Sequence, residues 1–386
     1  MKHIAILGST GSIGQSTLEV IAGLPDEFKV VALSTNSNID ILHRQIRRFV
    51  PEVVAVANAQ SARALEGRLS GGVKLLGGED ALLQLLEHRH IDLVVLAISG
   101  SAALLPLIKS IEEGRDVALA NKEALVMAGD IVTKKAKKKK VKILPIDSEQ
   151  SAIWQCIDGK KKDTLKKIYL TASGGPLRDL SLAQIKRISL RRVLKHPRWK
   201  MGKKITVDSA TLMNKGLELI ESMLLFDLDI GEIEIVIHPE AVIHSMAEFI
   251  DGSILAQLSV TDMRIPIQYA LSYPARYPNS LAPLDFFRLK SLSFYKPDFN
   301  KFPCLGLSFE AARRAGSLPC VLNASNEVAV EAFLKGRISF LSIPKIIEKV
   351  LASHRVILQP KLEDIFRTDS WARQKAEEFT CRFARG

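Results

Sequence analysis

Short apolar runs alternate with amphipathic stretches along the first third of the chain. Seven such runs, separated mostly by segments with the apolar spacing of helices, occupy residues 3–8, 28–34, 52–57, 73–77, 91–98, 116–120 and 141–146. A strand covered by helices on both faces is apolar throughout, so this alternation predicts a parallel sheet between two layers of helices. We therefore expect a doubly wound, Rossmann-like α/β domain over residues 1–147.

After residue 148 the spacing of the apolar runs changes. Three runs follow one another closely, at residues 233–238, 241–250 and 253–260. The last two are joined by Asp251 and Gly252, a dipeptide typical of the turn of a β-hairpin. The pattern predicts a second α/β domain over residues 148–272.

The last part of the chain begins with residues 273–303, which carry several prolines and little periodicity, and we interpret them as a linker. Helical spacing of apolar residues then returns in four segments, at residues 307–316, 321–336, 342–354 and 371–383. We expect a C-terminal helical domain over residues 304–386.

Composition narrows the classes of protein. A chain of 386 residues, 47% of them hydrophobic, is long enough for two or three domains. Its formal charge of +12 favours an anionic partner, such as a phosphate ester or a nucleotide. A lysine run at residues 134–140 is typical of a solvated helix end, and no aromatic platform accompanies it. We therefore expect no nucleic-acid partner.

The compartment is indicated by the cysteines and by the N-terminus. The four cysteines are widely spaced, which is typical of a reducing compartment. The N-terminus enters the first predicted strand without a cleavable signal, and no apolar run reaches the roughly 18 residues of a membrane span. We expect a cytoplasmic protein with no membrane partner.

A glycine-rich turn, "GSTGSIG" from Gly8 to Gly14, lies between the first predicted strand and the first predicted helix. Such glycines let the backbone approach a pyrophosphate, and the helix N-terminus adds a favourable dipole. A turn of this kind can also serve packing alone. The hydroxyls of Ser9, Thr10 and Ser12 favour dinucleotide binding.

The end of the second predicted strand, "STNSN" at residues 34–38, lacks the acid that usually holds a free ribose 2′-hydroxyl. Hydroxyl and amide groups can donate hydrogen bonds to a 2′-phosphate, whereas a carboxylate would repel it. The turn therefore predicts NADPH in preference to NADH.

Two acids, Asp147 and Glu149, follow the last strand of the predicted parallel sheet. If the segment is extended, side chains two residues apart point the same way, and both carboxylates can reach one divalent cation such as Mg²⁺ or Mn²⁺. The alternative is a helix cap and a surface acid. A third acid is needed to favour the metal.

Residues 208–221 are predicted to form one helix that offers this acid. Asn214 and Glu218 share a face, and Lys215 lies beside it, so an amide, an ammonium and a carboxylate could hold a phosphorylated, metal-chelated substrate. A surface salt bridge is the alternative. The packing side of the helix is expected to hold Leu212, Met213, Leu217, Leu219 and Ile220.

Seven motifs together resemble the 1-deoxy-D-xylulose 5-phosphate reductoisomerase family, in order and over essentially the whole chain. They are "GSTGSIG" at 8–14, "ANKEALV" at 120–126, "PIDSE" at 145–149, "TASGGP" at 171–176, "KHPRWKMG" at 195–202, "DSATLMNKGLE" at 208–218 and "LNASNEVAVEAFL" at 322–334. The resemblance implies a metal-assisted rearrangement of 1-deoxy-D-xylulose 5-phosphate and its reduction by NADPH to 2-C-methyl-D-erythritol 4-phosphate, the committed step of non-mevalonate isoprenoid biosynthesis. It also implies a homodimer.

The resemblance assigns roles to residues of this chain. Mg²⁺ or Mn²⁺ is assigned to Asp147, Glu149 and Glu218. Catalytic roles fall to Glu149, Lys122 and His196. Substrate contacts fall to Lys122, Ser148, Glu149, Ser173, His196, Trp199, Ser209, Asn214, Lys215 and Glu218. Of these, the residues around the phosphate are Ser173, Ser209, Asn214 and Lys215. NADPH contacts fall to Thr10, Gly11, Ser12, Ile13, Asn36, Ser37, Asn38, Asn121, Glu123 and Gly202.

Three departures from the family pattern are present, and one is Gln150, which replaces a frequent histidine after the metal pair. Asn36 and Ser37 stand where many members have Gly-Lys, which removes a cation from the 2′-phosphate site. Arg198 and Lys200 make the segment over the substrate more basic, which either strengthens attraction of the anionic substrate or only reflects the high charge of the chain. The competing functions are another NAD(P)-linked dehydrogenase with a separate substrate domain and a basic nucleic-acid-binding protein.

Overall fold

The computed structural model describes residues 1–69, 71–197, 199 and 201–384. The chain divides into two compact units, each built from separate stretches of sequence. Unit 1 comprises Met1–Ala124, Val132–Ser151 and Asp262–Leu281, and unit 2 comprises Leu125–Ile131, Ala152–Thr261 and Ala282–Gly386. The four-part division expected from the sequence stays a prediction.

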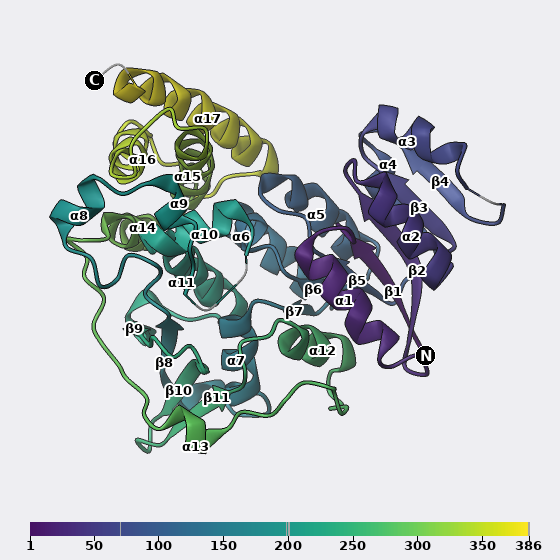
Figure 1. The fold of residues 1–386 in the computed structure, drawn as a ribbon, viewed down its shortest axis with the longest axis horizontal. Helices are drawn as coiled ribbons and strands as arrows, with labels where there is room; N and C mark the ends of the chain where they lie inside the picture. Colours follow the sequence, from purple (N-terminus) through teal and green to yellow (C-terminus); the bar gives the residue numbers. More distant parts are fainter. Residues whose placement is uncertain (70, 198, 200, 385–386) are drawn as a thin grey trace. The chain divides into compact units, whose positions relative to one another are not determined.

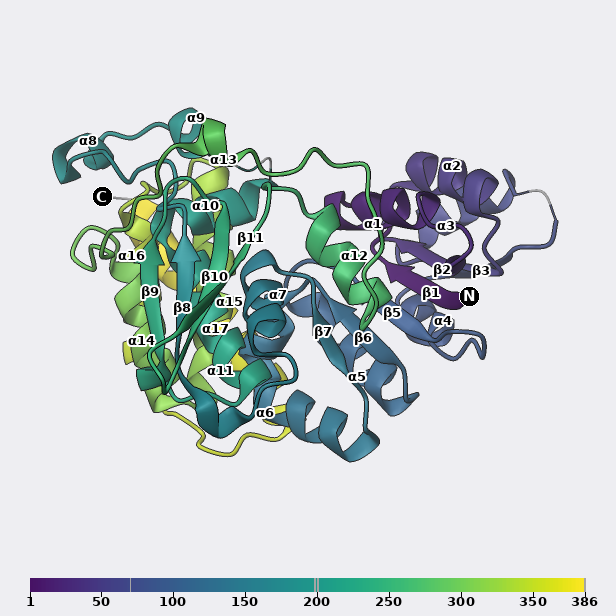
Figure 2. The ribbon, with the colours of Figure 1, turned by 90° about the horizontal axis from the view of Figure 1, so that it is seen from below.

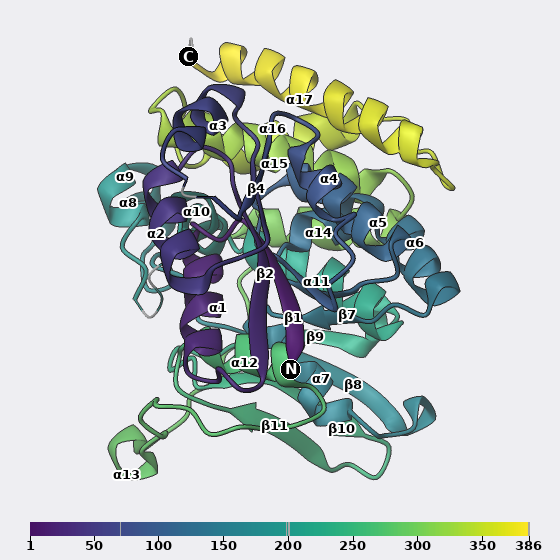
Figure 3. The same ribbon diagram turned by 90° about the vertical axis from the view of Figure 1, so that its right-hand side faces the viewer.

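Unit 1 contains a seven-stranded sheet in the order β4-β3-β2-β1-β5-β6-β7, and every pairing is parallel. Each strand falls on one of the seven predicted apolar runs, and β1 and β2 lie side by side in Figure 3. The strands are β1 (Lys2–Leu7), β2 (Phe28–Thr35), β3 (Val53–Val56), β4 (Lys74–Gly77), β5 (Leu93–Leu96), β6 (Asp116–Leu119) and β7 (Ile143–Pro145). The predicted doubly wound sheet is confirmed.

Helices cover both faces of this sheet: α1, α2 and α12 lie on one face, and α4 and α5 on the other (Figure 2). The helices wholly within unit 1 are α1 (Ser12–Ala22), α2 (Ile39–Phe49), α3 (Ala59–Glu66), α4 (Ala81–Leu85), α5 (Leu104–Glu112) and α12 (Arg264–Ser272), and α6 (Lys122–Lys139) and α7 (Ser148–Ile157) begin there. The strand order reverses between β1 and β5, and ligands of open parallel sheets bind beyond the carboxyl ends of strands at such a point.

Unit 2 contains a four-stranded sheet in the order β11-β10-β8-β9, with β8 and β9 parallel and the other pairings antiparallel. Its strands are β8 (Leu165–Ala172), β9 (Ile233–Ile237), β10 (Ile243–Phe249) and β11 (Ile254–Leu258). The predicted hairpin at Asp251 and Gly252 is confirmed, and Gly252 has a φ of +84°. Strand β8 was not predicted, because Lys166 and Lys167 interrupt the apolar run at its start.

The helices of unit 2 lie beside this sheet, and α17 packs along α15 and α16 (Figure 1). They are α8 (Leu182–Lys186), α9 (Leu190–Val193), α10 (Lys203–Thr211), α11 (Met213–Phe226), α13 (Phe286–Leu289), α14 (Pro303–Arg314), α15 (Leu318–Leu334), α16 (Ser342–Ala352) and α17 (Leu362–Ala384). One hydrophobic core joins Leu170 of β8 to Val321 of α15 and Ile346 of α16. The C-terminal helices therefore share a core with the second sheet.

The prediction of a single helix over residues 208–221 is wrong. Residues 208–221 fall on two helices, because Leu212 adopts the left-handed conformation with a φ of +59° and separates α10 from α11. The expected packing side is nevertheless buried, since Leu212, Met213, Leu217, Leu219 and Ile220 are all at most 4% exposed. Among the described helices, none combines the length and hydropathy needed to cross a bilayer.

Candidate active site

The glycine turn after β1 is shaped by two close approaches. A Cβ atom on Gly8, whose φ is +86°, would lie 2.6 Å from the carbonyl oxygen of Ala97, and one on Gly14 would lie 2.4 Å from that of Gly8. These two glycines therefore serve packing. Gly11 and Ser12, at the start of α1, are exposed. The N-terminus of this helix has the form that accepts a pyrophosphate.

The turn after β2 divides into an inner and an outer part. Ser34 is buried, and its Oγ accepts a hydrogen bond from the Gly8 backbone at 3.1 Å, so it braces the glycine turn. Asn36, Ser37 and Asn38 are exposed, and the Asn38 side chain caps α2. Contact of these outer residues with a ribose stays a prediction.

Asn121 holds the loop after β5 against the start of α6. Its Nδ2 donates to the carbonyl oxygens of Ile98 and Gly100, at 2.9 and 3.0 Å, and to the Glu123 carboxylate at 3.0 Å. Its Oδ1 accepts from the Ala124 backbone and so caps α6. Because Gly8 packs on Ala97, unit 1 brings the glycine turn and Asn121 to the same edge of the sheet.

The acids after β7 do not lie in an extended segment, and that expectation is wrong. Helix α7 begins at Ser148, directly after Asp147, so Glu149 lies in its first turn. The Asp147 carboxylate accepts from the Ser148 backbone at 3.1 Å, and the Ser148 hydroxyl donates to Glu149 at 2.6 Å. Acids are stabilised at a helix N-terminus by the unpaired backbone N–H groups and the helix dipole.

Lys122, at the start of α6, completes this group in unit 1. Its Nζ lies 2.5 Å from Asp147 Oδ2, and its side chain is 6% exposed. A buried ammonium beside a carboxylate balances charge that would otherwise be costly to desolvate. Unit 1 thus brings Lys122, Asp147, Ser148 and Glu149 together at one place.

A second group lies on α11 in unit 2. The Asn214 amide and the Lys215 ammonium both donate to the Glu218 carboxylate, as expected from their spacing. The side chains of Lys215 and Glu218 are 4% and 1% exposed, so this is not a surface salt bridge. An anionic ligand could take the place of Glu218 as the acceptor for Asn214 and Lys215.

His196 lies between two serines, Ser209 of α10 and Ser173 of the loop after β8. Its Nε2 lies 3.2 Å from Ser173 Oγ and 3.1 Å from Ser209 Oγ, and its Nδ1 accepts from the Trp199 backbone at 2.9 Å. Burial lowers the pKa of His196 to about 4, so the imidazole is neutral near pH 7. Because Nδ1 is an acceptor, the proton of the neutral ring is on Nε2.

Gly175, Trp199 and Gly202 lie in the same part of the sequence of unit 2 as these residues. Gly175 has a φ of +68°, and a Cβ atom there would lie 2.5 Å from the Ser209 carbonyl oxygen, so glycine lets the loop after β8 reach Ser209. The Trp199 ring lies 6.3 Å from that of His244. Gly202 is the exposed N-cap of α10. Arg198 and Lys200 lie outside the described residues.

A buried network that was not predicted from the sequence lies beside Ser209. Asn326 of α15 donates to Asp208 Oδ1 at 2.9 Å, and Lys204 lies 2.8 Å from Asp208 Oδ2. Asp208 and Asn326 are buried. Asn326 is one of several polar residues in "LNASNEVAVEAFL", so nothing in the sequence singled it out. The contact ties α15 to the residue beside Ser209.

Comparisons with known proteins identify the family. A family model described as 1-deoxy-D-xylulose 5-phosphate reductoisomerase matches residues 4–129, and two described as C-terminal domains of the same enzyme match residues 143–226 and 258–375. A protein of that name from Pelotomaculum thermopropionicum is 50% identical over 375 residues, covering 97% of this chain and 97% of the relative. This chain belongs to the 1-deoxy-D-xylulose 5-phosphate reductoisomerase family.

Other members of the reductoisomerase family agree in sequence and in fold. The relative from Ruminiclostridium cellulolyticum is 49% identical, with 98% of this chain and 99% of that one covered. The reductoisomerase of Zymomonas mobilis in complex with NADPH has a TM-score of 0.92 at 41% identity, with 98% and 99% covered. A crystal structure of the reductoisomerase with NADPH, fosmidomycin and magnesium also has a TM-score of 0.92, at 40% identity, with 99% and 98% covered. The resemblance found in the sequence is confirmed.

Proposed function

We propose that this chain catalyses the metal-dependent rearrangement of 1-deoxy-D-xylulose 5-phosphate and its NADPH-dependent reduction to 2-C-methyl-D-erythritol 4-phosphate. The product belongs to non-mevalonate isoprenoid biosynthesis. The observation that carries the proposal is the identity of 50% over 97% of the chain with a reductoisomerase. The proposal is further supported by relatives whose structures contain NADPH, fosmidomycin and magnesium.

The metal fits the acids assigned to it, Asp147, Glu149 and Glu218. Carboxylate oxygens are the hard ligands that Mg²⁺ and Mn²⁺ prefer. Bound there, the cation would polarise the carbonyl and hydroxyl oxygens of the substrate and stabilise negative charge that develops on them. Lys122 and Lys215 accompany two of these acids and balance their charge within the protein.

The phosphate of the substrate is assigned to Ser173, Ser209, Asn214 and Lys215. Neutral donors with one ammonium suit a phosphate dianion, since the hydrogen bonds fix orientation and the cation supplies attraction. His196, neutral with its proton on Nε2, donates a hydrogen bond in the same group. Substrate would compete with Glu218 for the donors of Asn214 and Lys215.

The reacting end of the substrate is assigned to Lys122, Ser148 and Glu149, with Lys122, Glu149 and His196 in catalytic roles. Lys122 holds a positive charge where oxygen atoms become negative, and Ser148 orients the Glu149 carboxylate. Trp199 would exclude water from the substrate. NADPH supplies the hydride and is assigned to Thr10, Gly11, Ser12, Ile13, Asn36, Ser37, Asn38, Asn121, Glu123 and Gly202.

The competing reading, another NAD(P)-linked dehydrogenase with a separate substrate domain, does not require the group on α11. One absorbance assay distinguishes the two. The purified protein should oxidise NADPH only when 1-deoxy-D-xylulose 5-phosphate and Mg²⁺ or Mn²⁺ are both present, and a chelator should abolish the rate. NADPH oxidation that persists with chelator, or that fails with this substrate, would contradict the proposal.

We infer that the chain prefers NADPH but reads the 2′-phosphate weakly, because Asn36, Ser37 and Asn38 are exposed neutral side chains. Ser37→Lys should raise the NADPH-to-NADH ratio of kcat/KM about tenfold, and Ser37→Asp should reverse or abolish the preference. Ser61→Lys, a substitution at the half-buried start of α3, is the control for added charge. An unchanged ratio in both Ser37 variants would show that this turn does not contact the 2′-phosphate.

We also propose that the chain acts as a homodimer in the cytoplasm. The homodimer rests on the family resemblance. The cytoplasm is supported by the cysteines, since Cys156, Cys304, Cys320 and Cys381 are all free thiols and the first three are buried.

A further inference from the structure

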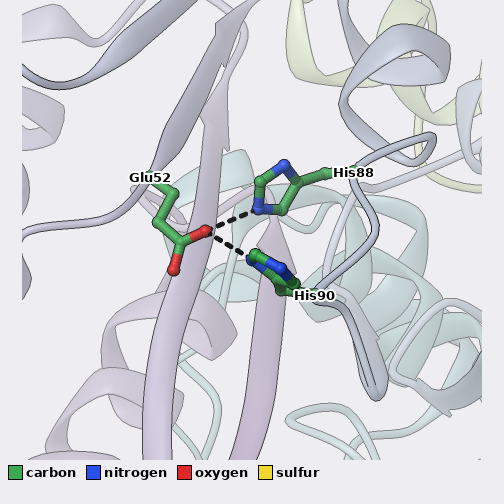
Figure 4. Close-up of side chains that lie close together, drawn as sticks. All are labelled: Glu52, His88 and His90. Carbon is green, nitrogen blue, oxygen red and sulfur yellow. Dashed lines mark hydrogen bonds and ion pairs between the residues drawn. The ribbon is translucent and has the colours of Figure 1, made fainter.

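Glu52, His88 and His90 converge in unit 1, where a single carboxylate oxygen meets two imidazoles (Figure 4). Glu52 Oε2 lies 2.9 Å from His88 Nε2 and 2.9 Å from His90 Nδ1. The two rings are nearly perpendicular, at 82°, with their centroids 5.3 Å apart. One potential ligand atom from each residue thus lies within 4.8 Å of the other two.

This cluster is separate from the residues assigned to catalysis. Glu52 directly precedes β3, and His88 and His90 precede β5, so all three lie at the amino ends of parallel strands. The glycine turn and Asn121 follow the carboxyl ends of their strands. Since the strands are parallel, the two groups occupy opposite edges of the sheet.

The backbone around the cluster is held in place. The Glu52 N–H donates to Val31, and the Glu52 carbonyl accepts from Lys74, so this residue is fixed between neighbouring strands. The Arg115 guanidinium donates to the carbonyl oxygens of His88 and Arg89, at 3.4 and 3.2 Å. Ligands held on a rigid backbone lose little entropy when they bind an ion.

We propose that Glu52, His88 and His90 form a second metal site, specific for a transition ion of the zinc type and structural in role. Two imidazole nitrogens and one carboxylate suit Zn²⁺, Co²⁺ or Ni²⁺, whereas three carboxylates suit Mg²⁺ or Mn²⁺. The ion would link the start of β3 to the loop before β5. No step of the proposed reaction depends on it.

A bound ion would require its three ligand atoms, which all lie within 4.8 Å of one another, to adjust their spacing. A tetrahedral ion with bonds of about 2.0 Å separates its ligand atoms by about 3.3 Å, so the two 2.9 Å contacts open by a few tenths of an ångström. The nitrogens that would bind the ion, His88 Nε2 and His90 Nδ1, must carry no proton, so in each ring the proton lies on the other nitrogen. His90 is 62% exposed, which leaves solvent for a fourth ligand.

The charges around the site set its strength. The negative charge of the site comes from Glu52, whose carboxylate lies within hydrogen-bonding distance of His88, His90 and Lys29. Lys29 Nζ lies 3.0 Å from Oε1, the oxygen that faces away from the imidazole contacts, and its positive charge opposes a dication. Nearby, His3 Nδ1 lies 3.2 Å from Asp92 Oδ2. Removing the Lys29 charge should therefore strengthen metal binding.

The test is calorimetric titration of the full-length protein with Zn²⁺ in excess Mg²⁺, so that binding at the three acids is common to all proteins compared. Every protein carries Cys381→Ser, because this exposed thiol is a competing ligand. The parent should bind one more zinc ion than His88→Ala or His90→Ala, or bind it at least tenfold more tightly. His43→Ala, at an outlying histidine of the same unit, should match the parent.

Lys29→Gln keeps a donor for Oε1 but removes the charge, and it should tighten zinc binding several-fold. The result for Lys29→Gln can be interpreted even if the histidine variants fold poorly. Melting curves of the histidine variants in EDTA show whether they are folded without metal. Zinc should also raise the Tm of the parent more than that of His90→Ala. Equal zinc binding by the parent and both histidine variants, or no tightening in Lys29→Gln, would overturn the proposal and leave the cluster as an ion pair with hydrogen bonds.

Discussion

Glu149→Gln should lower kcat by about 10²- to 10³-fold, because it removes one negative ligand from the proposed metal site while preserving size. The Ser148 hydroxyl, now 2.6 Å from Glu149, can donate to the glutamine carbonyl as well, so the start of α7 should survive. The measurement is kcat at saturating substrate as a function of Mg²⁺ concentration. We expect the Mg²⁺ requirement to rise as kcat falls.

Asp130→Asn is the matched control, since Asp130 is an exposed acid on α6. It should leave both kcat and the Mg²⁺ requirement unchanged. Glu149 is preferred to Glu218 for this experiment, because Glu218→Gln would leave the buried ammonium of Lys215 without a carboxylate. Near-normal turnover of Glu149→Gln at ordinary Mg²⁺ would remove Glu149 from the metal site.

Lys215→Ala should lower kcat/KM for the phosphorylated substrate by about 10²- to 10³-fold, through both a higher KM and a lower kcat. Binding energy at the phosphate also positions the carbons that rearrange, so its loss appears in both constants. The decisive measurement is the ratio of kcat/KM for the phosphorylated and the dephosphorylated substrate. That ratio should collapse in the variant.

Lys345→Ala, at an exposed lysine of α16, controls for the loss of one positive charge. Lys215→Gln provides a second variant, since it keeps a donor near Glu218 and should be intermediate in kcat/KM. Melting curves separate a folding defect from a binding defect, because the alanine variant leaves the buried Glu218 carboxylate without its ammonium. If Lys215→Ala still prefers the phosphorylated substrate as strongly as the parent does, Lys215 does not bind the phosphate.

The sequence was informative wherever chemistry repeats at short range. The seven apolar runs predicted the seven strands of unit 1, because a strand buried on both faces must be apolar throughout. The spacing of Asn214, Lys215 and Glu218 predicted their mutual contacts, because the helical repeat alone brings them together. The family resemblance followed from motifs that can be read without any coordinates.

Local patterns failed where two conformations were compatible with the same residues. Leu212 ends one helix and precedes another, although leucine is a good helix former, and nothing nearby in sequence marks its positive φ. Ser148 begins a helix where a continued strand was expected. Strand β8 has lysines at its start and was missed, although Leu170 lies in the core of unit 2 and the strand pairs with both β10 and β9.

The sequence by itself determined the family, the parallel sheet and the residue types available for metal, phosphate and nucleotide. Only the tertiary structure decided which of these side chains are buried and which distant residues meet. It placed Asn326 against Asp208 and brought Glu52 to His88 and His90. Such contacts join residues far apart in the chain, and no local periodicity encodes them. They exist because packing of the sheets and helices fixes where each backbone lies, and polar side chains buried by that packing must find partners there.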